Sequence, residues 1–356
     1  MSFFNARRLV ILLGNFKITI KLLNRNLVLK RIIVGIILCR MLAVNAFSQD
    51  AEFSQFFNAP LYLNPAFAGV GEGPRFCLNY RNQWAALDNA YLSYTASYDQ
   101  NFEAINGGIG VLMMTDRQAG GLLSTTGISG IYSYQLNVSQ KFGLKAGAQF
   151  SYVQKRIDAA QLVFAENINP DNGSITGGIS ADVPDNTSKG IADIGGGVLI
   201  YTKSFYAGLS AKHVTSPNES FYSSQISPWP VRVAANIGIE FRSRKNARTA
   251  AYFSPNLLYV QQASFRQLNA GAILGVGVVY AGLYFRSAFE NSDAVIVMAG
   301  LKRGVFKFGY SYDATVSSLE STGGTHELSL VLNFHDSKKV QFRRNTRRFT
   351  DCPEVF

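Results

Sequence analysis

The chain has 356 residues, a formal charge of +11, 32 glycines, three cysteines and 13% aromatic residues. Charged residues make up only 16% of it, too few for a disordered chain or a coiled coil. The cysteines are too sparse for a disulfide scaffold, and no apolar run reaches the roughly 18 residues of a transmembrane helix. The composition therefore indicates a large β-protein.

The positive charge lies at the two ends of the sequence. Residues 1–48 contain eight basic and no acidic side chains, and residues 335–356 contain six basic and three acidic ones. The body between them, residues 49–334, is neutral overall. A nucleic-acid interface needs a basic face on the folded body, so we expect no nucleic-acid partner.

The N-terminal segment has the pattern of an export signal. Lys30 and Arg31 precede the apolar run 32–38, and small residues follow as far as Ser48. A basic start, a short apolar stretch and an A-x-S site are typical of a cleaved secretory signal peptide. We expect residues 1–48 to be a signal peptide with an N-terminal extension, removed after Ser48. A buried core helix is the alternative.

Apolar side chains alternate with small or polar ones along most of the chain after residue 72. The clearest example is 231–241, in which every odd position is apolar. A period of two predicts strands with one apolar and one polar face. About fourteen such strands are predicted, at 74–84, 90–102, 107–115, 125–138, 141–154, 190–202, 204–214, 230–242, 248–261, 265–274, 277–287, 292–301, 304–313 and 324–334.

These strands and their connections suit a membrane barrel. The strands are long enough to cross hydrocarbon when tilted, and longer than those of an ordinary globular sheet. Connections after odd-numbered strands are mostly long, up to 155–189, whereas those after even-numbered strands are tight, as in outer-membrane barrels. We predict an all-β fold over 72–334: a transmembrane, antiparallel, up-and-down β-barrel of about 14 strands. A soluble β-helix or propeller is the alternative.

The predicted barrel implies positions for two sets of side chains, basic ones and aromatic ones. Basic residues on polar faces would point into the lumen, because at the lipid midplane each would cost about 2–4 kcal/mol. These lumen-facing candidates are Arg75, Arg81, Lys145, Lys212, Arg232 and Arg286. Aromatic residues near strand ends would form interfacial girdles, and they are Trp84, Tyr91, Tyr98, Tyr152, Tyr201, Tyr312 and Phe334.

No catalytic or metal-binding pattern stands out. The three histidines, His213, His326 and His335, are isolated in the sequence and form no metal-ligand spacing. No strand-to-helix phosphate loop surrounds the glycine clusters. We therefore predict a protein without enzymatic activity, cofactor or metal.

Two segments flank the predicted barrel. Residues 49–71 are rich in aromatics and contain Asn64-Pro65, and a proline limits hydrogen bonding in a strand ladder. This segment is predicted to be a periplasmic arm or a plug in the lumen. Residues 335–356 form a basic C-terminal tail, either a solvated end or a partner-docking peptide.

Three stretches of the sequence resemble the PorP/SprF family, outer-membrane proteins of the type IX secretion and gliding-motility systems of Bacteroidota. The resemblance covers essentially the whole chain after the predicted signal peptide. The residues that carry it are Gln55, Asn58, Asn64, Pro65 and Gly69, then His213, Pro217 and Asn218, and finally Gly323, Gly324, His326 and Glu327.

The resemblance implies a non-enzymatic role in the cell outer membrane. Members of this family are similar to helpers that export or anchor a large cell-surface adhesin, and some dock an OmpA-like periplasmic protein that binds peptidoglycan. By that analogy the long connections would face outward, and the arm and tail would face the periplasm. A diffusion channel or small-solute transporter of the outer membrane is the alternative, since a barrel of this size can enclose an aqueous lumen.

Overall fold

A computed structural model of the chain describes most of the predicted barrel and the segment before it. The described residues are 49–71, 73–87, 91–137, 142–175, 183–243, 251–289, 294–316 and 322–334. The predicted signal peptide and the basic tail lie outside them.

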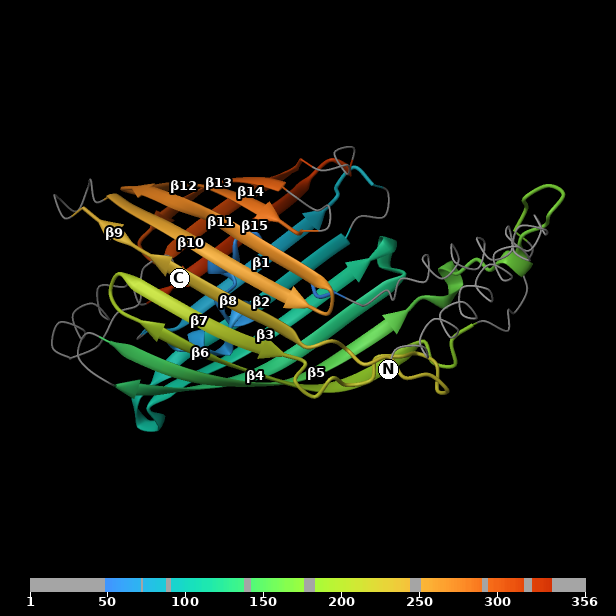
Figure 1. The fold of residues 1–356 in the computed structure, drawn as a ribbon, viewed down its shortest axis with the longest axis horizontal. Helices are drawn as coiled ribbons and strands as arrows, with labels where there is room; N and C mark the ends of the chain where they lie inside the picture. The colour runs from blue at the N-terminus through green and yellow to red at the C-terminus, as the bar shows by residue number, and fades with distance from the viewer. Residues whose placement is uncertain are drawn as a thin grey trace, which may run out of the picture. The chain divides into compact units, whose positions relative to one another are not determined.

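Within these residues the strands form one antiparallel sheet in chain order, drawn as a ribbon in Figure 1. The strands are β1 Arg75–Gln83, β2 Tyr91–Phe102, β3 Gly107–Gln118, β4 Leu123–Asn137, β5 Gly143–Ile157, β6 Ser188–Tyr201, β7 Phe205–Lys212, β8 Arg232–Ile239, β9 Phe241–Arg242, β10 Ala251–Gln262, β11 Phe265–Val276, β12 Val279–Ser287, β13 Ala294–Arg303, β14 Phe306–Thr315 and β15 Thr325–Asn333.

The sheet closes on itself. β1 pairs with β15 in an unbroken register that begins with Arg75 opposite Asn333. β8 and β9 are separated by Glu240 alone and both pair with β10, so they count as one strand. The described residues therefore form a closed barrel of 14 antiparallel strands. The predicted up-and-down barrel is confirmed, and every predicted strand overlaps an observed one.

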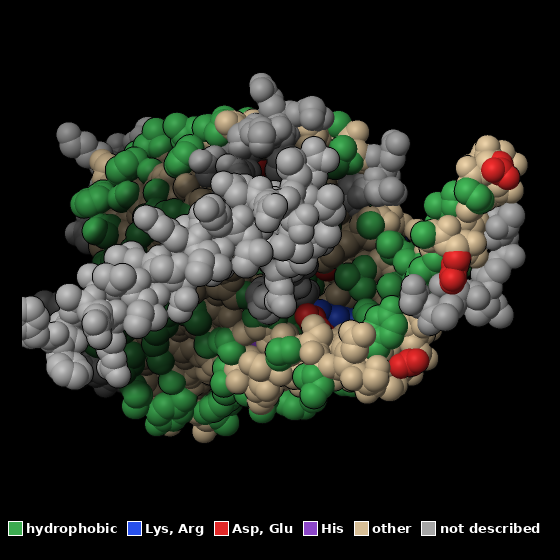
Figure 2. All heavy atoms as spheres, turned by 45° about the vertical axis from the view of Figure 1, so that its right-hand side comes forward, with side chains coloured by type: hydrophobic (Ala, Val, Ile, Leu, Met, Phe, Trp, Pro, Cys, Tyr) green, Lys and Arg blue, Asp and Glu red, His purple; other side chains and the backbone are tan. Residues whose placement is uncertain are grey.

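The outer surface of the barrel is apolar, as the space-filling view in Figure 2 shows. Strand alternation produces it: in β8, Val233 and Ile237 are exposed, whereas Arg232 and Asn236, each one position before them, are buried. One girdle prediction is wrong, because Tyr201 is fully buried. Tyr201 lies at one of the inward-facing positions of β6, so its ring points away from lipid.

The two ends of the barrel differ. One end carries the two longest connections, 158–187 and 213–231, and the first of these projects beyond the strands in Figure 1. The other end carries tight turns such as 202–204 and 304–305. This agrees with the predicted asymmetry, although 263–264, at the long-connection end, is also a tight turn.

Short helical turns occupy the segment before β1 and some connections. None of the helices in the described part of the chain is long and apolar enough to cross a membrane. The turns are η1 Phe56–Asn58, α3 Pro60–Leu63, η2 Pro65–Phe67, η3 Glu103–Ile105, η4 Ala119–Gly121, η5 Ala159–Gln161 and η6 Ala165–Asn167.

Candidate functional site

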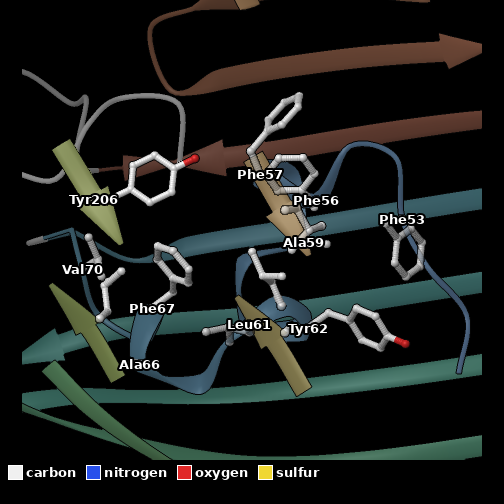
Figure 3. Close-up of a cluster of buried hydrophobic side chains, with 14 of the residues drawn as sticks. Phe53, Phe56, Phe57, Ala59, Leu61, Tyr62, Ala66, Phe67, Val70 and Tyr206 are labelled. Atoms are coloured by element: carbon white, nitrogen blue, oxygen red, sulfur yellow. The ribbon is translucent and has the colours of Figure 1, made fainter. Parts of the chain in front are cut away.

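Residues 50–70, called the plug segment here, lie inside the barrel. Every residue of 53–70 is buried, and the aromatic rings pack on one another and on the wall (Figure 3). Phe56, for example, meets Tyr284 of β12 edge to face, with ring centroids 5.9 Å apart. Because so many rings would otherwise expose apolar surface to water, packing inside the barrel stabilises the segment.

The local sequence shapes the plug segment into turns. Pro60 and Pro65 each begin a short helical turn, where the fixed φ of proline is suitable and its missing N–H costs nothing. The side chain of Asn64 caps the second turn by accepting a hydrogen bond from the Ala66 N–H at 2.8 Å. It also donates to the Val198 carbonyl of β6 at 3.0 Å, which ties the turn to the wall.

Glu327 of β15 holds the beginning of the plug segment. Its carboxylate accepts hydrogen bonds from the backbone N–H groups of Ser54, at 2.8 Å, and Gln55, at 2.9 Å. The Gln55 side chain donates to the Glu327 carbonyl at 3.2 Å, and Asn58 donates to Ser329 Oγ at 2.7 Å. These five residues are all buried. Removal of one partner would therefore leave a buried polar atom without a hydrogen bond.

Two arginines complete this attachment. Arg81 lies 3.1 Å from Glu327 Oε2 and 3.3 Å from Asp313 Oδ2, and Arg286 lies 2.8 Å from the same Asp313 oxygen. Both arginines also donate to Ser54 Oγ, at 2.8 and 2.7 Å. Two guanidinium groups therefore face two carboxylates. We call Arg81, Arg286, Asp313 and Glu327 the arginine–carboxylate cluster. Its balanced charges make burial tolerable.

The far end of the plug segment is held by a second set of charges. Lys145 Nζ donates to the carbonyls of Ala68, at 2.7 Å, and Gly69, at 2.9 Å. The Gly69 N–H donates to Asp99 Oδ2 at 2.7 Å, and Arg75 pairs with Asp99 at 2.9 Å. The last turn before β1 is therefore fixed to the wall by backbone contacts that need no particular plug side chain.

His213, at the end with the long connections, lies between two carboxylates. Its Nε2 is 2.8 Å from Asp50 and its Nδ1 is 3.0 Å from Asp193, while its ring stacks on Trp229 at a centroid distance of 3.8 Å. Burial opposes the charged imidazole, but the two carboxylates outweigh it and raise the pKa of His213. Burial likewise opposes ionisation of Asp50, yet His213 holds the pKa of that carboxyl below its ordinary value. The contact ties the start of the plug segment to this end.

The six basic residues predicted to face the lumen are all buried. Each of them contacts the plug segment, so they hold the chain's own backbone and side chains rather than line an open pore. The contacts are Arg75 to the Phe67 carbonyl at 3.1 Å, Arg81 and Arg286 to Ser54, Lys145 to Ala68 and Gly69, Lys212 over the Tyr62 ring at 3.5 Å, and Arg232 to Glu52 at 2.6 Å.

The residues that carry the family resemblance divide into two groups. One group meets at the lumen: Gln55, Asn58, Asn64, Pro65 and Gly69 lie in the plug segment, and Glu327 and His213 bind it. The other group has local roles outside the lumen, and it consists of Pro217, Asn218, Gly323, Gly324 and His326.

Asn218, Gly324 and His326 illustrate these local roles. Asn218 Oδ1 accepts from the N–H groups of Ser220 and Ser227, which folds the connection 213–231. Gly324 has a positive φ of 68°, a conformation that favours glycine, in the turn before β15. His326 does not join Glu327, because adjacent positions of a strand face opposite sides.

The acidic partners of the basic residues are not among the residues predicted from the sequence. Asp99 and Asp313 occupy inward positions of β2 and β14 and are buried, so the same alternation that marks the arginines could have found them. Asp50 and Glu52 precede any strand and carry no such signal. Their role depends on where the barrel places His213.

The chemistry of the site is suited to binding a polypeptide segment. Its groups are hydrogen-bond donors, acceptors and balanced ion pairs arranged along the plug segment. Among the described residues no three or more histidine, cysteine or acidic side chains are grouped so as to hold a metal ion.

No curated protein matches the sequence. Solved structures that resemble the chain include Omp33 of Acinetobacter baumannii, with 10% identity over 75% of this chain and 100% of that one and a TM-score of 0.41. A Pseudomonas aeruginosa FadL homologue has 11% identity over 74% of this chain and 90% of that one, with a TM-score of 0.37.

The family is shown by the sequence itself. Residues 45–332 match the model of the type IX secretion system membrane protein PorP/SprF. This range covers the plug segment and nearly all of the barrel. The closed strand pairing and the apolar outer surface are those of an outer-membrane β-barrel. The chain therefore belongs to the PorP/SprF family of type IX secretion system membrane proteins.

Proposed function

We propose that this protein is a non-enzymatic component of the type IX secretion system that helps to export a large gliding-type adhesin or to anchor it on the cell surface. The observation that carries the proposal is the filled lumen. The buried stretch 53–70 occupies the barrel interior, and every predicted lumen-facing basic residue contacts the plug segment. Such a barrel offers its two ends, rather than a pore, for function.

The filled lumen also weighs against the alternative, a diffusion channel or small-solute transporter. A channel needs a continuous aqueous path between the two ends. Opening one would require the arginine–carboxylate cluster and the contacts of Lys145 and Asp99 to release the plug segment. Removing one partner of a buried ion pair costs about 3–5 kcal/mol, so thermal motion would rarely open such a path.

The two ends of the barrel suit two kinds of partner. Long connections of outer-membrane barrels face outward and short turns face the periplasm, so 158–187 and 213–231 are the proposed docking surface for the adhesin. β15 ends at the short-turn end, beside the start of β1. That end is the proposed contact for an OmpA-like periplasmic protein that binds peptidoglycan.

Affinity purification from native outer membranes in mild detergent, followed by mass spectrometry, tests the proposal. We expect a large adhesin, or an OmpA-like periplasmic protein, to co-purify in stoichiometric amounts. A barrel that purifies alone and conducts ions in a bilayer would support the channel instead.

The connection 158–187 allows a sharper test. Arg156 pairs with Ser188 across the hairpin, and the Ile157 N–H donates to the Thr187 carbonyl at 2.9 Å. An Asn-Gly turn that joins Ile157 directly to Thr187, in place of 158–186, can therefore close β5 on β6 in the same register. We expect this variant to fold, as heat-modifiable migration on a gel would report, and to lose the adhesin. Unchanged adhesin display would refute outward docking.

A further inference from the structure

A cavity of about 70 Å³ lies beside the plug segment, at the end that carries the long connections. It reaches from the start of the plug segment down the inward faces of β3 to β7. Figure 2, turned so that this end comes forward, shows charged side chains recessed there. A water occupies roughly 10–15 Å³ on this measure, so the space fits a group of a few heavy atoms.

Three buried polar atoms on the cavity lining have no hydrogen-bond partner among the described residues. They are Trp229 Nε1, a donor, and two acceptors, Gln149 Oε1 and Asp193 Oδ1. The Gln149 amide is held in place because its Nε2 donates to Ser129 and Ser151, at 3.0 Å each. Since unsatisfied buried polar groups are costly, the three atoms mark where a hydrogen-bonding ligand would bind.

The charged side chains of the lining already have partners. Lys155 pairs with Glu219, and His213 lies between Asp50 and Asp193. Lys212 lies over the Tyr62 ring, and Asp116 accepts hydrogen bonds from Ser93 and Gln118. An uncharged group therefore fits better than an ion, which would have to be desolvated without a free counter-charge.

The remaining lining favours a peptide over a sugar. Leu112 and Val153 are buried on the cavity wall and would contact the carbon atoms on either side of an amide group. Sugar rings usually need a free aromatic face, but the Trp229 ring stacks on His213 at 3.8 Å and lies 3.9 Å from Lys155 Nζ. A peptide unit offers both the N–H that Gln149 can accept and the carbonyl to which Trp229 can donate.

We propose that this cavity binds one backbone amide group of a polypeptide, and that the polypeptide is presented by the exported partner. The identity of the partner rests on the proposed function above, whereas amide binding by the cavity does not. The long connections would bring the partner to this end, and the cavity would then bind one of its backbone amide groups.

Trp229 itself can report the binding. The sequence has two tryptophans, so a Trp84→Phe variant leaves Trp229 as the only one. N-methylacetamide, which carries a single amide group, should cause a saturable change in Trp229 emission when it is titrated into the purified full-length barrel in mild detergent. Methyl glucoside should cause none. No saturable change, which would mean that only water fills the cavity, or a response to the glucoside instead, would overturn the proposal.

A matched pair of variants in β5 tests the role of the amide acceptor. Gln149→Leu should weaken the apparent affinity for N-methylacetamide at least tenfold. Gln154→Leu should leave it unchanged, because Gln154 is exposed and bonds only Ser188 among the described residues. Equal affinity in the two variants would overturn the proposal, provided that heat-modifiable migration shows both barrels folded. If the adhesin still co-purifies in that case, the proposed function stands and the amide site alone fails.

Discussion

The carboxylate of Glu327 accepts the backbone N–H of Gln55 at 2.9 Å, across 272 residues of sequence. This contact joins the last strand of the barrel to the plug segment that precedes the first. Closure of the sheet between β1 and β15 and filling of the lumen therefore depend on the same region of the wall.

Removing the Glu327 carboxylate should release the beginning of the plug segment. Glu327→Leu leaves the N–H groups of Ser54 and Gln55 without an acceptor and Arg81 without one of its carboxylates. We expect the free energy of unfolding, measured by urea titration in lipid vesicles, to fall by about 3–5 kcal/mol. His326→Leu, on the outward face of the same strand, is the control, with an expected loss of about 1 kcal/mol. Equal losses would refute the attachment.

Gly147 of β5 lets the plug segment approach the wall. A Cβ at this position would lie 2.4 Å from the Ala66 nitrogen. Gly147→Ala should therefore destabilise the barrel by roughly 1–3 kcal/mol through overpacking and raise its ion conductance by displacing the plug. Gly130→Ala is the matched control, since its Cβ would meet no atom within 4 Å. Identical stability and conductance of the two variants would show that the plug segment does not press on β5.

The direction of the plug segment predicts which end of the barrel Gln49 reaches. Asp50 contacts His213 beside the long connections, so Gln49→Cys should react with a membrane-impermeant maleimide on intact cells. Ile226→Cys, in an exposed part of 213–231, should react likewise, whereas Lys203→Cys, in a short turn, should react only after permeabilisation. The background should carry serine in place of Cys352. Labelling of Gln49→Cys only after permeabilisation would place the start of the plug segment in the periplasm.

The His213 contact should depend on pH. The folded pKa of His213 is raised above its ordinary value of 6.5, so its stabilising effect is complete below that pH and is lost as the pH rises through the folded pKa. The groups that face it are Asp50 and Asp193, and the cations Lys212 and Arg232 act on Asp50.

A spin label at Gln49→Cys can follow this change. We expect low label mobility at about pH 5 and a step to higher mobility toward alkaline pH, since neutral imidazole no longer attracts Asp50. In the His213→Gln background the step should vanish. A step that persists without His213 would assign the titration to another group.

Much of the barrel was predictable because period-two alternation reports directly which side chains face lipid. The same alternation identified Arg81 and Arg286 as inward-facing residues, but it does not distinguish an open lumen from a filled one. That distinction depends on Ser54 and Gln55, whose backbone N–H groups bind Glu327 from a segment without periodicity. Contacts between backbone and distant side chains leave no local trace in a sequence, which is also why Asp50 was missed as a partner of His213.

Ion conductance of the purified full-length barrel in a planar lipid bilayer tests the central claim, a lumen filled by the plug segment, most directly. The account predicts no steady conductance for the unmodified protein and a measurable increase for Gly147→Ala. Steady conductance of the unmodified barrel, unchanged by Gly147→Ala, would contradict the account and indicate an open channel.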